Sequence, residues 1–170
     1  MFSLQNTLGR LSPHLAHAAA ETASAFFSAS LTANTALSLQ RLTDFGSLRC
    51  SQKNIGENYE MTLNLAVDKI AWNKMFISGE SEVLKMDAFC EMANCICGTV
   101  LADPSFSDEF GYMIPCVPCF GPSPQGSMDS STLRGVFRLG ACWIHYTFTL
   151  QETVSIGLKS NAPSRLMASI

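Results

Sequence analysis

The sequence predicts an α+β fold, in which helices pack on an antiparallel-dominated β-sheet. Residues 81–102 carry apolar side chains with the period of an α-helix. Residues 60–67 alternate apolar and polar side chains, as a half-buried strand does, and residues 133–150 are rich in aromatic and β-branched side chains. With 170 residues, of which 47% are hydrophobic, the chain is long enough to form one domain with a core.

A helix and one or two strands are expected before these elements. Ser12 and Pro13 are typical of a helix start, since serine caps helix N-termini and proline fits the first turn. The alanine-rich segment that follows keeps apolar side chains on one face as far as Leu31, which predicts a first helix. Residues 35–52 predict one or two short strands, and residues 54–58 predict a loop.

A short helix is expected directly after the alternating strand. Asp68 is a good N-cap residue, and the predicted helix runs from it through Phe76. We expect Ile70 and Met75 to point toward the core and Trp72 to be partly covered.

The helix at 81–102 has two contrasting faces. Because residues three and four apart share a face of a helix, Asp87, Glu91, Asn94 and Gly98 form one polar stripe. The expected core residues on the opposite side are Met86, Phe89, Cys90, Ala93, Ile96, Cys97 and Val100. An acid and an amide one turn apart on an otherwise apolar helix indicate a surface that a partner approaches closely.

After this helix the sequence predicts a loop followed by more strands. Residues 104–111 are polar and predict a loop, and residues 112–120 are extended, with two prolines that place them at a sheet edge or bulge. The β-rich run 133–150 is expected to bend near Gly140, and residues 152–159 predict the last strand.

The polar stripe also carries a resemblance. Glu91-Met-Ala-Asn94-Cys-Ile-Cys-Gly98 resembles the E-x-x-N-x-x-x-G signature helix of the CheC/CheX/FliY phosphatases of bacterial chemotaxis. A strand and a short helix precede this motif, and residues 113–121 resemble the family's proline-containing strand that leads into a glycine turn. The chain has one such motif, so it looks closest to the single-motif CheX type.

The resemblance implies a phosphatase that hydrolyses the aspartyl phosphate of a CheY-like response regulator and ends a two-component signal. Asn94 is then expected to hold the attacking water, because a carboxamide both donates and accepts hydrogen bonds. The resemblance implies that Glu91 pairs with the active-site lysine of the receiver. Asp87 and Gly98 would contact the receiver, where the missing Cβ of Gly98 allows close approach. Mg²⁺ would come with the receiver, so no cofactor of the chain's own is expected.

Two alternatives stay open beside this interpretation. One is a catalytically silent CheX-like module that only binds a receiver or a flagellar-switch partner. The other is a cysteine-based metal or redox module, because Cys116 and Cys119 have C-x-x-C spacing. No second C-x-x-C accompanies this pair, and Cys95 and Cys97 lie about 200° apart on a helix, so they cannot face one ion. We expect no metal site.

Composition limits the partners. The net charge is −3, so no basic surface for nucleic acid is expected. No apolar run approaches the roughly 20 residues that a membrane span needs. Seven cysteines, an odd number, fit a reducing cytoplasm better than a disulfide framework.

The expected domain organisation is simple. Residues 1–11 would form a loose arm, residues 12–160 a single CheX-like domain, and residues 161–170 a loose tail. The resemblance also implies a homodimer that pairs through its sheets, with the β-rich run 133–150 as the candidate edge.

Overall fold

The computed structural model describes the central part of the chain and a few residues of the N-terminal segment. The described residues are Gly9, Pro13, His17, Glu21, Thr22, 31–34, 47–76, 79–121, 132–139 and 142–153. The predicted N-terminal arm, except for Gly9, and the predicted C-terminal tail therefore lie outside the described residues. Within the described part, no helix is long and apolar enough to cross a membrane.

The described strands form one sheet, and each of their pairings is antiparallel. The order across the sheet is β1-β6-β7-β3-β2-β4, and β5 also pairs with β2. The strands are β1 (Leu31–Asn34), β2 (Ser47–Gly56), β3 (Tyr59–Asp68), β4 (Met113–Pro115), β5 (Cys119–Phe120), β6 (Thr132–Leu139) and β7 (Cys142–Glu152). The predicted antiparallel-dominated sheet is confirmed.

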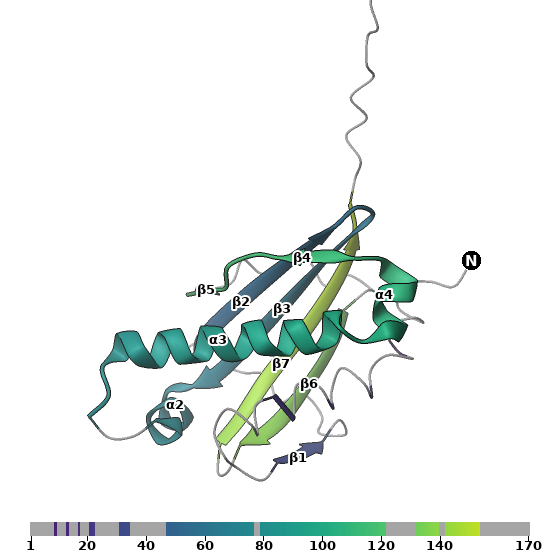
Figure 1. Cartoon of the computed structure of the whole chain (residues 1–170). Coiled ribbons are helices and arrows are strands. Elements are labelled where there is room, and N and C mark those ends of the chain that lie inside the picture. The colour runs from purple at the N-terminus through teal and green to yellow at the C-terminus, as the bar shows by residue number, and fades with distance from the viewer. Residues whose placement is uncertain are drawn as a thin grey trace, which may run out of the picture.

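The helices of the central part are α2 (Lys69–Met75), α3 (Glu82–Leu101) and α4 (Pro104–Phe110). Figure 1 shows α3 lying across one face of the sheet, with α2 near its first turn and α4 after its last. The extended segment that contains β4 and β5 runs alongside α3, and both strands contact the helix (Figure 1). Helix α3 thus lies over the β2 side of the sheet.

Helix α3 forms where the sequence predicts it. The hydroxyl oxygen of Ser81 caps its N-terminus by accepting a hydrogen bond from the Leu84 backbone N–H, with 3.3 Å between donor and acceptor. The predicted core face is buried at Phe89, Ala93, Ile96, Cys97 and Val100, whereas Met86 and Cys90 are only partly buried. Met92 is buried as well, so the apolar face is wider than the spacing suggested.

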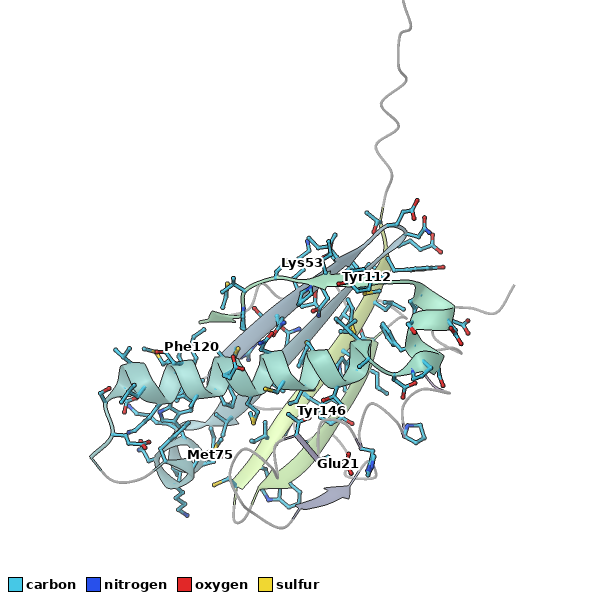
Figure 2. All side chains as sticks on the ribbon, in the orientation of Figure 1. Glu21, Lys53, Met75, Tyr112, Phe120 and Tyr146 are labelled. Carbon is cyan, nitrogen blue, oxygen red and sulfur yellow. The ribbon has the colours of Figure 1, made fainter. Side chains whose placement is uncertain are left out.

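The core between α3 and the sheet is built on aromatic side chains. The ring of Trp72 lies 5.4 Å from the rings of both Phe89 and Phe120, measured between centroids. Figure 2 shows Phe120 beside the N-terminal half of α3. The indole N–H of Trp72 also donates to the carboxylate of Glu82 over 3.1 Å, which ties α2 to the first turn of α3.

The short helix α2 begins at its predicted cap but faces a different way. Asp68 accepts hydrogen bonds from the backbone N–H groups of Ile70 and Ala71, both over 2.8 Å. The predicted orientation was wrong: Ile70 is 71% exposed, whereas Trp72 is 1% exposed and belongs to the core. Met75 is partly buried against the core, as expected. The direction in which the chain leaves β3 decides which side of so short a helix is covered.

Two predicted loops are wrong in part. Strand β2 continues to Gly56, so most of the predicted loop 54–58 is paired with β3 and β4. Residues 104–111 are not a loop, because α4 occupies all but the last of them. Asp103 caps this helix, and Phe106 and Phe110 are buried one turn apart beneath its polar surface.

The β-rich run reverses direction between Leu139 and Cys142, where the sequence predicts a bend. It forms two antiparallel strands, β6 and β7, and β6 lies between β1 and β7. Strand β7 is therefore interior to the sheet, and β1 covers β6 from Val136 to Leu139. Residues 132–135 of β6 have no partner on that side among the described strands, so the part of the expected pairing edge that stays open is this half of β6. The homodimer itself stays a prediction.

The ends of the described region bear on the remaining predictions. Leu31 begins β1 and is not part of the first helix, whereas Pro13, His17, Glu21 and Thr22 are helical as expected. Strand β7 ends at Glu152, and the rest of the predicted last strand, from residue 154, lies outside the described residues.

The covered face of α3 makes the first testable prediction. Phe89→Ala should lower the free energy of unfolding by about 3–5 kcal/mol, because Phe89 is 0% exposed and the substitution leaves a cavity. The matched control is Val83→Ala on the same helix, where the side chain is 60% exposed, and it should change stability by less than about 0.5 kcal/mol. Urea unfolding followed by circular dichroism measures both. Similar losses in the two variants would contradict this packing.

Candidate functional site

The polar stripe of α3 lies opposite the buried face of the helix, and Asn94 lies at its border with β2. Asp87, Glu91 and Gly98 are exposed, and Asn94 is half-buried. The stripe residues lie opposite the buried face that Phe89, Ile96 and their neighbours form, since the helix turns by about 100° per residue. The structure therefore brings the four predicted site residues together on one surface.

Glu91 and Asn94 are hydrogen-bonded to each other. The amide nitrogen Nδ2 of Asn94 donates to Oε2 of Glu91 over 3.4 Å. The thiol of Cys95 donates to the other carboxylate oxygen of Glu91 over 3.6 Å. Both donors come from the turn that follows Glu91, so the helix itself holds the carboxylate against the amide.

A third side chain, from the sheet, completes this arrangement. Gln52 on β2 donates from Nε2 to Oδ1 of Asn94 over 3.1 Å. The sequence analysis did not identify Gln52. A signal was nevertheless present, because every second residue from Leu48 faces α3, and at these inward positions Gln52 and Asn54 are polar.

Among the described residues, nothing packs against the exposed glycine of the stripe. A Cβ built at Gly98 would meet no atom within 4 Å, apart from the backbone of its own helix turn and its immediate neighbours. Glycine in a helix interior is unfavourable by about 0.5–1 kcal/mol relative to alanine. No contact among the described residues therefore requires glycine at this position, and its backbone is exposed.

Apolar side chains are exposed near the stripe. Val83 and Leu84 are exposed in the first turn of α3, and Leu84 lies one turn before Asp87 on the same side. Ile114 and Val117 are exposed on the β4–β5 segment, which is held to β2 by a 2.8 Å bond from the Cys116 N–H to the Lys53 carbonyl. Exposed apolar side chains rimmed by polar groups are a feature of protein-binding surfaces.

The alternative interpretation depends on Cys116 and Cys119, and the structure describes both. Within the described residues, no three His, Cys, Asp or Glu side chains are close enough to hold a metal ion. Cys116 is half-buried and Cys119 is exposed, and both lie in extended backbone rather than at a helix N-terminus.

The thiols packed around α3 are poor nucleophiles. Burial raises the pKa of the Cys97 thiol to about 12, and burial is also the main cause of the raised pKa of Cys50, Cys90 and Cys95. Asp87 adds to the raised pKa of Cys90 through its negative charge. A thiol with a raised pKa is a poor nucleophile at neutral pH, because the thiolate is the reactive form.

Comparison with known proteins shows what the chain resembles in three dimensions. No protein-family model and no curated protein matches the sequence. Among solved structures, the chemotaxis protein CheX from Desulfovibrio desulfuricans superposes with a TM-score of 0.63 at 13% identity, over 84% of this chain and 99% of that one. CheX from Vibrio vulnificus gives a TM-score of 0.61 at 12% identity, over 81% and 96%.

A third solved structure contains a partner. It is the CheX–CheY–BeF3–Mg complex from Borrelia burgdorferi, with a TM-score of 0.59 at 14% identity over 81% of this chain and 96% of the matched chain. The resemblance drawn from the motif is thus confirmed for the fold, which is that of the CheX and CheC-like chemotaxis proteins.

The bare helix surface at Gly98 leads to a prediction for stability. Gly98→Ala should raise the free energy of unfolding by about 0.5–1 kcal/mol, because alanine removes the helix penalty of glycine and its methyl group meets open space. Gly56→Ala is the control that should destabilise, because its Cβ would lie 3.1 Å from the backbone oxygens of Tyr112 and Tyr59. Thermal unfolding of both variants shows whether each substitution raises or lowers the stability. A loss of stability in Gly98→Ala would show that the chain itself needs this glycine.

Proposed function

We propose that this protein is a phosphatase for a phosphorylated CheY-like receiver domain and so ends a two-component signal. The observation that carries the proposal is the hydrogen-bonded pair of exposed Glu91 and half-buried Asn94 on one helix of a CheX-like fold. The fold alone does not specify an activity. The pair supplies the two functional groups that the reaction needs in one place.

The proposed role of Asn94 is to hold the attacking water. Phosphoryl transfer passes through a loose transition state, so positioning and charge stabilisation supply most of the catalysis. A carboxamide has two N–H donors and two acceptor lone pairs. In Asn94 one donor is used by Glu91 and one acceptor position by Gln52, which leaves one of each for water and phosphoryl oxygen. A water held this way is aligned with the bond to be broken.

The proposed role of Glu91 is to anchor the receiver. Its exposed carboxylate accepts from Asn94 and Cys95 and still has lone pairs for a cation. A receiver active site holds a lysine close to its phosphoaspartate, and a charge-assisted bond from this lysine to Glu91 would place Asn94 over the phosphoryl group. Asp87 and Gly98 extend the contact surface on either side.

The metal belongs to the partner in this proposal. Mg²⁺ is bound by the receiver, where it neutralises phosphoryl charge. The residues of this chain that face the reaction are an amide and a carboxylate already engaged in hydrogen bonds. Their contribution is geometric and electrostatic, and the nucleophile is water.

Asn94→Ala should remove the catalysis and keep the complex. We expect the acceleration of phosphate loss from the receiver to fall about 100-fold, because water is no longer positioned, while the affinity for the receiver stays within about twofold. The measurement is the decay of a ³²P-labelled receiver, with binding followed separately by titration calorimetry. Asn73→Ala is the control, since Asn73 is an exposed asparagine on α2. Equal decay with and without the wild-type protein would leave only a docking role.

Glu91→Gln should act mainly on binding. The substitution keeps the shape and removes the negative charge, so the affinity for the phosphorylated receiver should fall by about 10- to 100-fold and lose part of its dependence on salt. Glu57→Gln in the β2–β3 turn makes the same chemical change at another exposed site and should have little effect. Unchanged affinity in Glu91→Gln would remove the anchoring role.

A further inference from the structure

We propose that Gln52 is a positioning residue for this site: from the buried face of the sheet it orients the carboxamide of Asn94. The inference rests on the proposed function, and it names a residue that touches neither receiver nor phosphate. Its observation is the 3.1 Å hydrogen bond from Gln52 Nε2 to Asn94 Oδ1, which joins residues 42 positions apart in the chain.

Gln52 is an unusual residue for its place. It is 0% exposed on β2, opposite Leu63 of β3 and beneath α3. Its oxygen Oε1 has no hydrogen-bond partner among the described residues. A buried amide with one end unsatisfied is unfavourable for folding, whereas an apolar side chain of the same length would fill the position without that cost. Asn54 on the same strand also has an unpartnered oxygen, so what distinguishes Gln52 is its bond to Asn94.

The three side chains can be connected in one polarity only. An ionised carboxylate accepts hydrogen bonds and donates none, so Asn94 must turn Nδ2 toward Glu91. Its oxygen Oδ1 then faces β2, where a donor is required. Gln52 Nε2 is that donor, and the relay runs from Gln52 through Asn94 to Glu91.

This relay gives the water-holding group a single orientation. The terminal torsion of an asparagine side chain is broad, so one contact to Glu91 leaves the amide free to rotate or to reverse its ends. Gln52 fixes it from the opposite side and from a rigid strand. A group that must place a water in line gains from such support, since small misplacements have large effects on rate.

The strand offers a matched comparison at Asn54. It is the next inward-facing residue on β2 and is also 0% exposed, but its Nδ2 donates to the Met61 carbonyl and to Cys97, away from the stripe. If activity depended only on having a buried amide under α3, substitution of Gln52 and substitution of Asn54 would lower the activity equally. A specific effect on Asn94 is expected for Gln52 alone.

The kinetic experiment measures phosphate loss from a phosphorylated CheY-like receiver at varied receiver concentration. Gln52→Met keeps the side-chain length and removes the donor, so kcat should fall about 10- to 100-fold while KM stays within about twofold. Asn54→Leu should leave kcat within about twofold. In an Asn94→Ala background, Gln52→Met should have no further effect, because its action passes through the missing amide. Wild-type kcat in Gln52→Met, or an equal further loss in that background, would overturn the proposal.

A measurement on the unmodified protein separates this inference from the proposed function. The side-chain NH₂ order parameter of Asn94 should approach that of the α3 backbone, while exposed Asn73 on α2 should show a much lower value. Equal mobility of the two amides would overturn the role of Gln52 even if the protein is an active phosphatase. A rigid Asn94 in a protein that does not accelerate phosphate loss would instead reject the proposed function alone.

Discussion

The burial of one face of α3 on the sheet is the constraint on which the rest of the structure depends. Phe89, Ile96 and Cys97 are completely buried, and Phe89 packs on the aromatic group that also joins α2 and β5. A helix held this way cannot turn about its axis without exposing large apolar side chains. The direction of the polar stripe is therefore set by the core beneath it rather than by contacts of its own.

The candidate site lies where the apolar contact between α3 and the sheet gives way to a polar one, between Asn94 and Gln52. Among the described strands, the short β4 and β5 are the ones that pair with β2 on its outer side, so α3 lies close to this edge of the described sheet. Asn94 is half-buried at this border, where it reaches both a fully buried glutamine and an exposed glutamate. A more deeply buried amide could not reach a binding partner, and a more exposed amide could not bond Gln52 on β2.

The elements that sequence reasoning located well are those with long, regular patterns. Helix α3 spans 20 residues and strand β3 spans 10, so each repeats its pattern several times. The errors fall on short or mixed segments. Helix α4 has only seven residues, and most of them are polar, so its two buried phenylalanines gave no clear helical pattern. In β2, the two inward-facing amides interrupt the alternation of apolar and polar residues by which a strand is identified. The orientation of α2 at Ile70 and Trp72 depended on the chain path and not on spacing.

The sequence by itself determined the helix that carries the site and the spacing that places Glu91 and Asn94 on one side of it, because both follow from contacts within a few residues. Only the tertiary structure decided that Gln52 meets Asn94. That contact depends on the register of β2 against β3 and on where α3 settles across the sheet, and neither is encoded in any local pattern. The physical reason is that side-chain periodicity describes one helix or strand at a time. The hydrogen bond between Gln52 and Asn94 depends instead on the position of α3 relative to β2.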